Sequence, residues 1–131
     1  MPMQPTPREL EILKVLWERG PSTVREVYEH QFQAQGVAQN TVQTLLRLMA
    51  DPKKGLVTFR QEGRTFVYTA AYSRDRFAAH FLDNVFDGAA SEMVLSLLRS
   101  ERIPPAELEQ MRAMIDAARK ANDRQSRGKG Q

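Results

Sequence analysis

The chain has 131 residues, of which 41% are hydrophobic and 27% charged, so it suits one globular domain or a small domain with an appendage. Its apolar runs are only a few residues long, so we expect no membrane insertion, and its N-terminus lacks the charged start and apolar core of a signal peptide. Because the chain has no cysteine, disulfides and thiolate metal sites are excluded and a cytoplasmic location is expected.

The net charge of +3 is small, but the basic residues are concentrated in one segment. From Arg8 to Gly36 there are four basic and five acidic residues, whereas from Val37 to Thr69 there are five basic and two acidic ones. A polyphosphate would be attracted to the second segment, and the attraction should weaken steeply with salt. The alternative is that these charges only keep a small domain soluble.

The first predicted element is a helix that begins at Pro7. Thr6 can cap it, proline suits the first helical position, and Glu9 completes a capping box. The pair Gly20-Pro21 ends the helix. Between these signals an apolar stripe at helical spacing predicts the buried side, with the tryptophan as a core residue: Leu10, Ile12, Leu13, Leu16 and Trp17.

A second helix is predicted to follow directly. Thr23 and Glu26 form another capping box, and Gly36 ends the helix. A third helix starts within a few residues of this glycine, so a short turn joins the two helices. A polar outer side on the third helix would make the pair a helix-turn-helix. The inner side of the second helix is predicted to consist of Val24, Val27, Tyr28 and Phe32.

The third predicted helix, residues 37–50, has two contrasting sides. Apolar residues recur at i, i+3, i+4 and i+7, namely Val42, Leu45, Leu46 and Met49. The opposite side carries amides, a hydroxyl and a guanidinium without any carboxylate: Asn40, Gln43, Thr44 and Arg47. Amides and guanidinium groups can form paired hydrogen bonds with base edges in the major groove of DNA. We therefore interpret this element as a recognition helix, with a plain surface helix as the alternative.

Two β-branched and aromatic runs come next, Leu56–Gln61 and Arg64–Thr69, around the turn Glu62-Gly63. A lone hairpin is only marginally stable, so this one should pack on the helices. Arg60 and Arg64 flank its tip, where they can reach phosphates or an adjacent minor groove, although a purely structural hairpin is the alternative. Three helices followed by such a hairpin predict a winged helix over residues 5–71.

The rest of the chain is predicted to form short apolar helices over residues 72–121 and a disordered basic tail over residues 122–131. Fifty residues rarely bury so much apolar surface alone, so we expect a twofold partner to cover it. The alternative is that these helices fold back onto the N-terminal domain. The predicted fold class is mainly α with a small β-hairpin wing: an N-terminal winged helix-turn-helix plus a C-terminal helical dimerisation region. The predicted dimer interface consists of Phe77, Phe81, Val85, Phe86, Val94, Leu97, Leu98, Leu108, Met111 and Ile115.

One further pattern extends over about residues 5 to 118. It consists of Glu9–Trp17, Thr41–Met49, Lys54–Val57, Glu62–Arg64 with Val67-Tyr68, Phe81–Asp83 and Phe86–Gly88. In these segments the chain resembles the penicillinase-repressor family (BlaI/MecI/CopY type) of bacterial winged-helix transcriptional repressors. The combination is fairly specific, whereas each segment alone is a weak signal.

The resemblance implies a homodimeric repressor that binds palindromic operator DNA, often at genes for β-lactam resistance. Its third helix would enter the major groove and its wing would contact the backbone. Release would follow a signal linked to a membrane sensor protease. The DNA contacts implied by the resemblance and by the charge pattern are Gln39, Asn40, Thr41, Gln43, Thr44, Arg47, Lys53, Lys54, Arg60 and Arg64.

The chain departs from the family pattern in three places. The turn Ala50–Gly55 is about two residues longer than usual. The β-lactamase repressors are typically cleaved at an Asn-Phe bond, where this chain has Ser96-Leu97. Copper-responsive relatives use C-terminal cysteine pairs, which this chain lacks. The inducing signal therefore stays open.

Two other classes of function are alternatives. A winged-helix protein-protein interaction module would dock a protein on its third helix without binding DNA. An enzyme has little support, because His30 and His80 fall in separate predicted helices and no phosphate-cradling glycine loop or nucleophile pairing stands out. We expect no cofactor and no metal.

Overall fold

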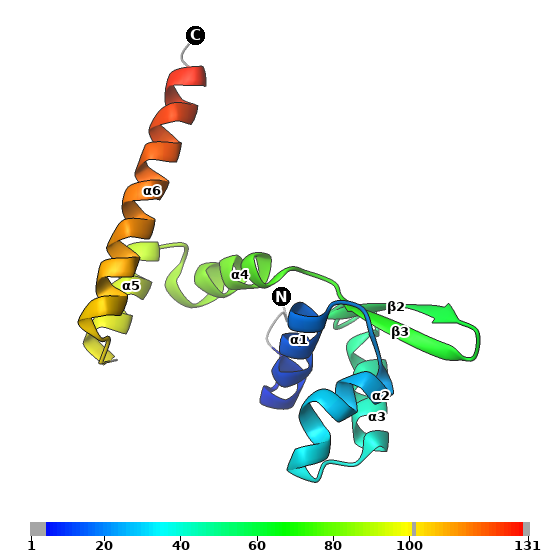
Figure 1. The fold of residues 1–131 in the computed structure, drawn as a ribbon. Coiled ribbons are helices and arrows are strands. Elements are labelled where there is room, and N and C mark those ends of the chain that lie inside the picture. Colours follow the sequence, from blue (N-terminus) through cyan, green and yellow to red (C-terminus); the bar gives the residue numbers. More distant parts are fainter. Residues whose placement is uncertain (1–4, 101, 130–131) are drawn as a thin grey trace. The chain divides into compact units, whose positions relative to one another are not determined.

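The computed structural model describes residues 5–100 and 102–129, which form two compact units (Figure 1). One unit ends at Gly88 and the other begins at Ala89. The mostly helical chain with one small sheet confirms the predicted fold class. The first unit contains α1 (Pro7–Arg19), β1 (Ser22–Thr23), α2 (Val24–Val27), α3 (Gln39–Met49), β2 (Val57–Glu62), β3 (Thr65–Ala70) and α4 (Arg74–Phe86), and the second contains α5 (Ala90–Ser100) and α6 (Pro105–Lys129).

Both predicted capping boxes are present. The hydroxyl of Thr6 accepts the backbone N–H of Glu9 at 3.2 Å, and the Glu9 carboxylate accepts the backbone N–H of Thr6 at 2.9 Å. Thr23 and Glu26 repeat this arrangement at 3.1 and 2.9 Å. Each box satisfies backbone donors that the first helical turn cannot pair internally, which fixes where α1 and α2 begin.

The second predicted helix is not regular, which the sequence did not indicate. After α2 the chain makes a π-helical turn over Tyr28–Phe32 and a 3₁₀ turn over Gln33–Gln35. A π turn pairs residues five apart, so it brings Val27 and Phe32 to the same side, and both are fully buried. Gly36 then takes a left-handed conformation with φ of 76°, which turns the chain into α3.

The sheet has three antiparallel strands in the order β1-β3-β2. The two-residue strand β1 was not predicted, because two residues carry no periodicity. The predicted hairpin is confirmed, with one shift: Glu62 pairs with Thr65, so the turn consists of Gly63 and Arg64 rather than Glu62 and Gly63. Gly63 has φ of 64° at the first central position, which fits a type II′ turn.

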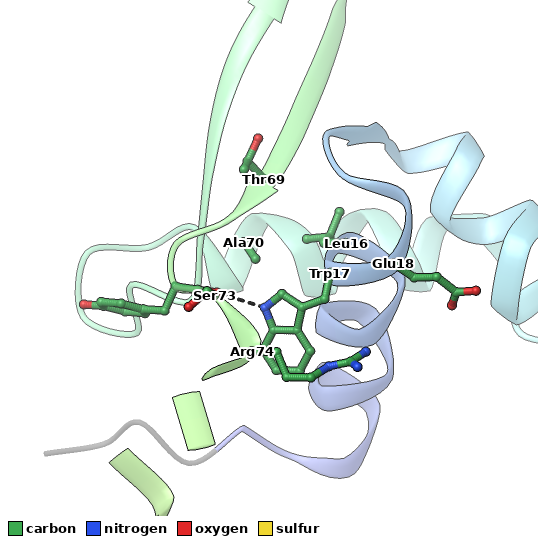
Figure 2. A pocket seen from close by; sticks show the side chains of 8 residues that line it. Leu16, Trp17, Glu18, Thr69, Ala70, Ser73 and Arg74 are labelled. Atoms are coloured by element: carbon green, nitrogen blue, oxygen red, sulfur yellow. Dashed lines mark hydrogen bonds between the residues drawn. The ribbon is translucent and has the colours of Figure 1, made fainter. Parts of the chain in front are cut away.

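The core of the first unit lies where α1, α2 and α3 meet the base of the hairpin. Of the predicted apolar side of α3, Val42, Leu46 and Met49 are fully buried, and Leu45 is partly buried against the same core. Trp17 is half-buried at the edge of this core, where its indole N–H donates to the carbonyl of Tyr72 at 2.8 Å (Figure 2). Its ring lies 5.6 Å from that of Phe77, so α4 is anchored to α1. The core residues are Ile12, Leu13, Val15, Leu16, Val27, Phe32, Val42, Leu46, Met49, Leu56, Val57 and Tyr68.

The second unit consists of two helices, and none of the side chains of α5 is buried within the single chain. The chain from Asn122 to Lys129 continues α6, so the prediction of a disordered tail from residue 122 is wrong for these residues. The physical reason is that the segment contains no proline and reaches its first glycine only at Gly128. Gly130 and Gln131 lie outside the described residues. No helix in the described part of the chain is long and apolar enough to cross a membrane.

Candidate nucleic-acid interface

The outer side of α3 is polar and fully available in the single chain. Its predicted contact residues Gln39, Asn40, Thr41, Gln43, Thr44 and Arg47 are all exposed. The first turn of the helix contains no acidic residue, and Arg47 lies in the last turn. The burial of Val42, Leu46 and Met49 holds this polar side outward, because these residues are completely covered by the core. The structure thus presents amide, hydroxyl and guanidinium groups on one rigid element.

A groove of about 410 Å³ separates the start of α3 from the hairpin. Arg25, at the start of α2, and Arg64, in the hairpin turn, both line this groove, together with the amides of Gln39 and Gln43. None of the described residues lining it is acidic. Two guanidinium groups with flanking amide and hydroxyl donors suit a phosphate chain. The remaining lining residues are Thr23, Val24, Thr65, Phe66 and Tyr68.

A second hollow lies between the end of α3 and the same face of the hairpin. It is lined by Arg47, Ala50, Asp51 and three aromatic residues, Phe59, Phe66 and Tyr68. The rings of Phe59 and Phe66 meet edge to face at 5.4 Å, and both remain exposed, at 54% and 43%. Burial raises the pKa of Tyr68, although the positive charge of Arg47 opposes this change. The wing therefore meets α3 through an aromatic surface.

Two of the predicted basic contacts are already engaged by carboxylates. Arg60 donates to Glu62 at 2.6 Å, with both side chains more than half exposed. Lys54 donates to the buried carboxylate of Glu9 at 2.5 Å. The neighbouring Lys53 is exposed, and its backbone N–H, not its side chain, donates to Asp51 at 2.9 Å. Lys54 thus has a structural role that the sequence did not indicate.

Glu9 is the buried charged residue that ties the start of α1 to the loop after α3. Burial by itself raises the pKa of this carboxyl group, but hydrogen bonds from Lys54 and Thr6 outweigh it and hold the pKa below the ordinary value of 4.5. Glu9 is only 2% exposed, and its carboxylate accepts from Thr6 before α1 and from Lys54 in the loop after α3. Its charge therefore helps to position the loop that follows the recognition helix.

The predicted interface residues fall into three groups. Phe77 contacts Trp17 and packs on the core of the first unit. For this residue the structure agrees with the alternative, in which the later helices fold back onto the N-terminal domain. Phe86 and Met111 are half-buried. The others are exposed large apolar residues in the single chain: Phe81, Val85, Val94, Leu97, Leu98, Leu108 and Ile115.

Sequence reasoning missed four residues near the polar side of α3. Arg25 was counted only as a charge, although its place in the first turn of a capped helix was a usable signal. Phe59 and Phe66 were treated as strand formers, since periodicity cannot show which face of a hairpin stays uncovered. Leu48 was left unassigned, and it is 50% exposed on the recognition helix.

Three packed helices, a hairpin and an exposed polar third helix define a winged helix-turn-helix protein. A family model described as penicillinase repressor matches residues 5–117. The penicillinase repressor of Bacillus licheniformis is 29% identical over 113 residues, covering 82% of this chain and 86% of that protein. The chain belongs to the penicillinase repressor family, which confirms the resemblance found in the sequence.

Two solved structures are also similar to this chain. The solution structure of the DNA binding domain of the repressor BlaI is 32% identical and covers 55% of this chain and 85% of its own, with a TM-score of 0.48. The solution structure of monomeric Bacillus licheniformis BlaI in complex with the blaP half-operator has the same identity and coverage and a TM-score of 0.46.

Proposed function

We propose that the protein is a homodimeric transcriptional repressor that binds palindromic operator DNA. In this proposal α3 enters the major groove and the hairpin wing contacts the backbone. The observation that carries it is the carboxylate-free outer side of α3, flanked by a groove that holds Arg25 and Arg64. Membership of the penicillinase repressor family supports the same function.

The backbone contacts proposed here follow from charge. DNA phosphates favour sites with converging guanidinium and amide donors, and the groove between α3 and the wing supplies both. Arg64 lies in the tight turn, so its position is fixed by the hairpin. Lys53 is exposed in the loop after α3 and would add a further phosphate contact. Arg60 would have to leave Glu62 before it could contribute, and Arg25 would have to exchange Glu29, which it contacts at 3.4 Å, for a phosphate.

Dimerisation over residues 72–121 is the second part of the proposal. Leu97 and Leu98 on α5, with Leu108 and Ile115 on α6, leave between 39% and 55% of their surface exposed in the single chain. A twofold partner would cover such apolar surface, and a dimer of helix-turn-helix units reads two half-sites. The palindromic operator follows from this symmetry.

We include release of the repressor from DNA by a signal linked to a membrane sensor protease because the chain belongs to the penicillinase repressor family. The bond Ser96-Leu97 lies inside α5, and the Ser100 hydroxyl donates to the carbonyl of Ser96 at 2.7 Å. A protease needs an extended substrate, so α5 would have to unwind before cleavage. Mass spectrometry of the protein after induction in a cell that carries the sensor would find or exclude a cut at this bond.

The experiment that tests DNA binding is a fluorescence titration of duplexes recovered from a random pool. Arg47→Ala should weaken binding to the recovered sequence by on the order of 1–3 kcal/mol and should relax the base preference at one base pair. Arg25→Ala and Arg64→Ala should each weaken binding to all sequences alike. Each should also make the fall of log affinity with log salt less steep by about one. Arg19→Ala, whose guanidinium pairs with Glu26, is the matched control.

If wild-type protein retains no duplex even at low salt, the proposed function is wrong and a protein-docking module becomes the better interpretation. If Arg47→Ala and Arg64→Ala both leave affinity unchanged, DNA binds elsewhere on the protein.

A further inference from the structure

The recognition helix has a less polar side, which combines two of the predicted DNA-contact residues with two leucines that have no role in the proposed function. Thr41, Thr44, Leu45 and Leu48 recur at i, i+3, i+4 and i+7, so they share one side of α3. Leu48 is half exposed, at 50%, although it is a large apolar residue on an otherwise polar outer surface. A single exposed leucine is common on protein surfaces, so its meaning depends on the residues beside it on the helix.

The structure shows a shallow hollow at this place. It measures about 300 Å³ and is lined by Asn40, Thr41, Thr44 and Leu45. Leu45 is partly buried against the core and forms an apolar floor, while the two threonines contribute methyl groups as well as hydroxyls. The hollow is open to the outside, and the amide of Asn40 lies at its edge.

The other side of α3 has a different chemistry. Gln39 and Gln43 line the groove beside the wing, and Arg47 lines the aromatic hollow. Asn40 lies between the two sides, since it follows Gln39 by one residue and precedes Thr44 by four. A helix that enters the major groove here would place hydrogen-bonding groups toward one strand and methyl groups toward the other.

We propose that this less polar side of α3, formed by Thr41, Thr44, Leu45 and Leu48, reads the 5-methyl group of thymine. Adenine offers N6 and N7 to an asparagine or glutamine amide, and its partner thymine offers a methyl group in the same groove. An A·T pair therefore matches Asn40 or Gln43 together with the apolar side. Cytosine lacks this methyl group, so the contact separates thymine from cytosine. The inference rests on the proposed DNA binding.

Uracil substitution tests the contact without changing the protein. Duplexes recovered from the random pool with wild-type protein would be resynthesised with each thymine replaced in turn by deoxyuridine, which removes only the methyl group. One or two thymines per half-site should lose about fourfold in affinity, as expected for one buried methyl. The remaining thymines should show no change.

Variants of the protein locate the contact on α3. Thr44→Ser keeps the hydroxyl but removes the methyl, and Leu48→Ala shortens the exposed side chain. Each variant should bind the thymine duplex more weakly than wild type does. Each should also lose most of its discrimination against uracil at one position, and a double-mutant cycle that combines the protein variant with the uracil substitution measures this loss. Thr58→Ser, at an exposed position on β2, is the matched control and should retain full discrimination.

The outcomes separate this inference from the proposed function. If recovered duplexes bind tightly but no uracil substitution changes their affinity, the thymine contact is wrong and DNA binding stands. If one thymine is sensitive but Thr44→Ser and Leu48→Ala keep the full uracil effect, another side chain reads the methyl and the assignment to this side of α3 is wrong. If the pool yields no bound duplex, both proposals fail.

Discussion

Arg60 and Glu62 lie two residues apart on β2, so their side chains share one face of the strand. The guanidinium and carboxylate meet at 2.6 Å and both stay exposed. Surface pairs of this kind add little to stability, but a carboxylate near a phosphate-binding surface repels DNA. Glu62 therefore limits what the basic tip of the wing can contribute to binding.

Replacing Glu62 tests this effect. Glu62→Gln should strengthen binding to unrelated duplexes by about two- to threefold at low salt and steepen the salt dependence, because Arg60 becomes available to phosphate. Glu109→Gln on α6 makes the same change of net charge in the other unit and serves as control. Equal effects of both variants would mean that only net charge matters.

Glu9 supports a prediction about acid stability. Its pKa is held below 4.5 in the folded protein, so the carboxylate stabilises the fold above pH 4.5. This contribution falls as the pH drops through 4.5 and is lost below the folded-state pKa. Glu9→Gln should lower the unfolding free energy at neutral pH by on the order of 1–3 kcal/mol and flatten its pH dependence below pH 4.5.

Thermal unfolding between roughly pH 3 and pH 7 checks this prediction. Glu18→Gln is the control, since Glu18 lies on the same helix with its side chain 69% exposed, 3.7 Å from His30. An acid transition that is the same in wild type and Glu9→Gln would show that Glu9 does not link the helix start to Lys54.

The geometry of the hairpin wing depends on the tight turn between β2 and β3. Gly63 has φ of 64° with only Arg64 beside it in the turn, and the paired strands extend from there to Val57 and Ala70. Because β2 also provides Phe59 and β3 provides Phe66, the turn sets how the aromatic side of the hairpin meets α3. The turn thus fixes both Arg64 and the surface beside Arg47.

Gly63→Ala should destabilise the protein by about 1–2 kcal/mol, because a side chain disfavours the left-handed conformation. Gly63→Asn should cost clearly less, since asparagine tolerates positive φ. Chemical denaturation of the two variants measures the difference. Loss of DNA affinity should follow the same order, and an alanine variant as stable as wild type would contradict the strained turn.

The sequence predicted the elements well where periodicity and capping agree. The starts of α1 and α2, the buried side of α3 and the two long strands all followed from such signals. The π turn at Tyr28–Phe32, by contrast, depends on burying Val27 and Phe32 together, which is a property of tertiary packing. The strand β1 forms only because β3 lies beside it.

The sequence predicted which side of α3 faces outward, but not how the wing packs beside it. The outward side of α3 followed from helical period, whereas the grooves on each side of it depend on where the wing packs. Pairing of Lys54 with Glu9 joins residues 45 positions apart, and a single sequence shows no sign of it. The outward position of Leu48 follows from the same helical period as Thr44, whereas the fraction of its surface that stays exposed depends on the assembled core.

The exposed apolar side chains of α5 and α6 are the main feature of the second unit. Leu98→Glu should prevent association, because a carboxylate cannot be buried unpaired in an apolar interface. Sedimentation should then show a monomer, and affinity for a two-half-site operator should fall at least about tenfold. Ser100→Glu, at an exposed polar position on the same helix, should leave association intact.

A Leu98→Glu protein that still sediments as a dimer would place the interface elsewhere. A wild-type protein that sediments as a monomer at all concentrations would remove dimerisation from the proposed function, while single half-site binding would remain testable by titration.

The uncovered leucines of α5 also bear on how the protein would behave at low abundance. If two copies must meet before these residues are sheltered, and most molecules are single, the concentration of pairs grows with the square of the total concentration. Halving the supply would then leave roughly a quarter of the pairs. A modest fall in protein concentration through growth or turnover would therefore raise transcription of the controlled gene steeply, with no change at the proposed DNA-binding surface.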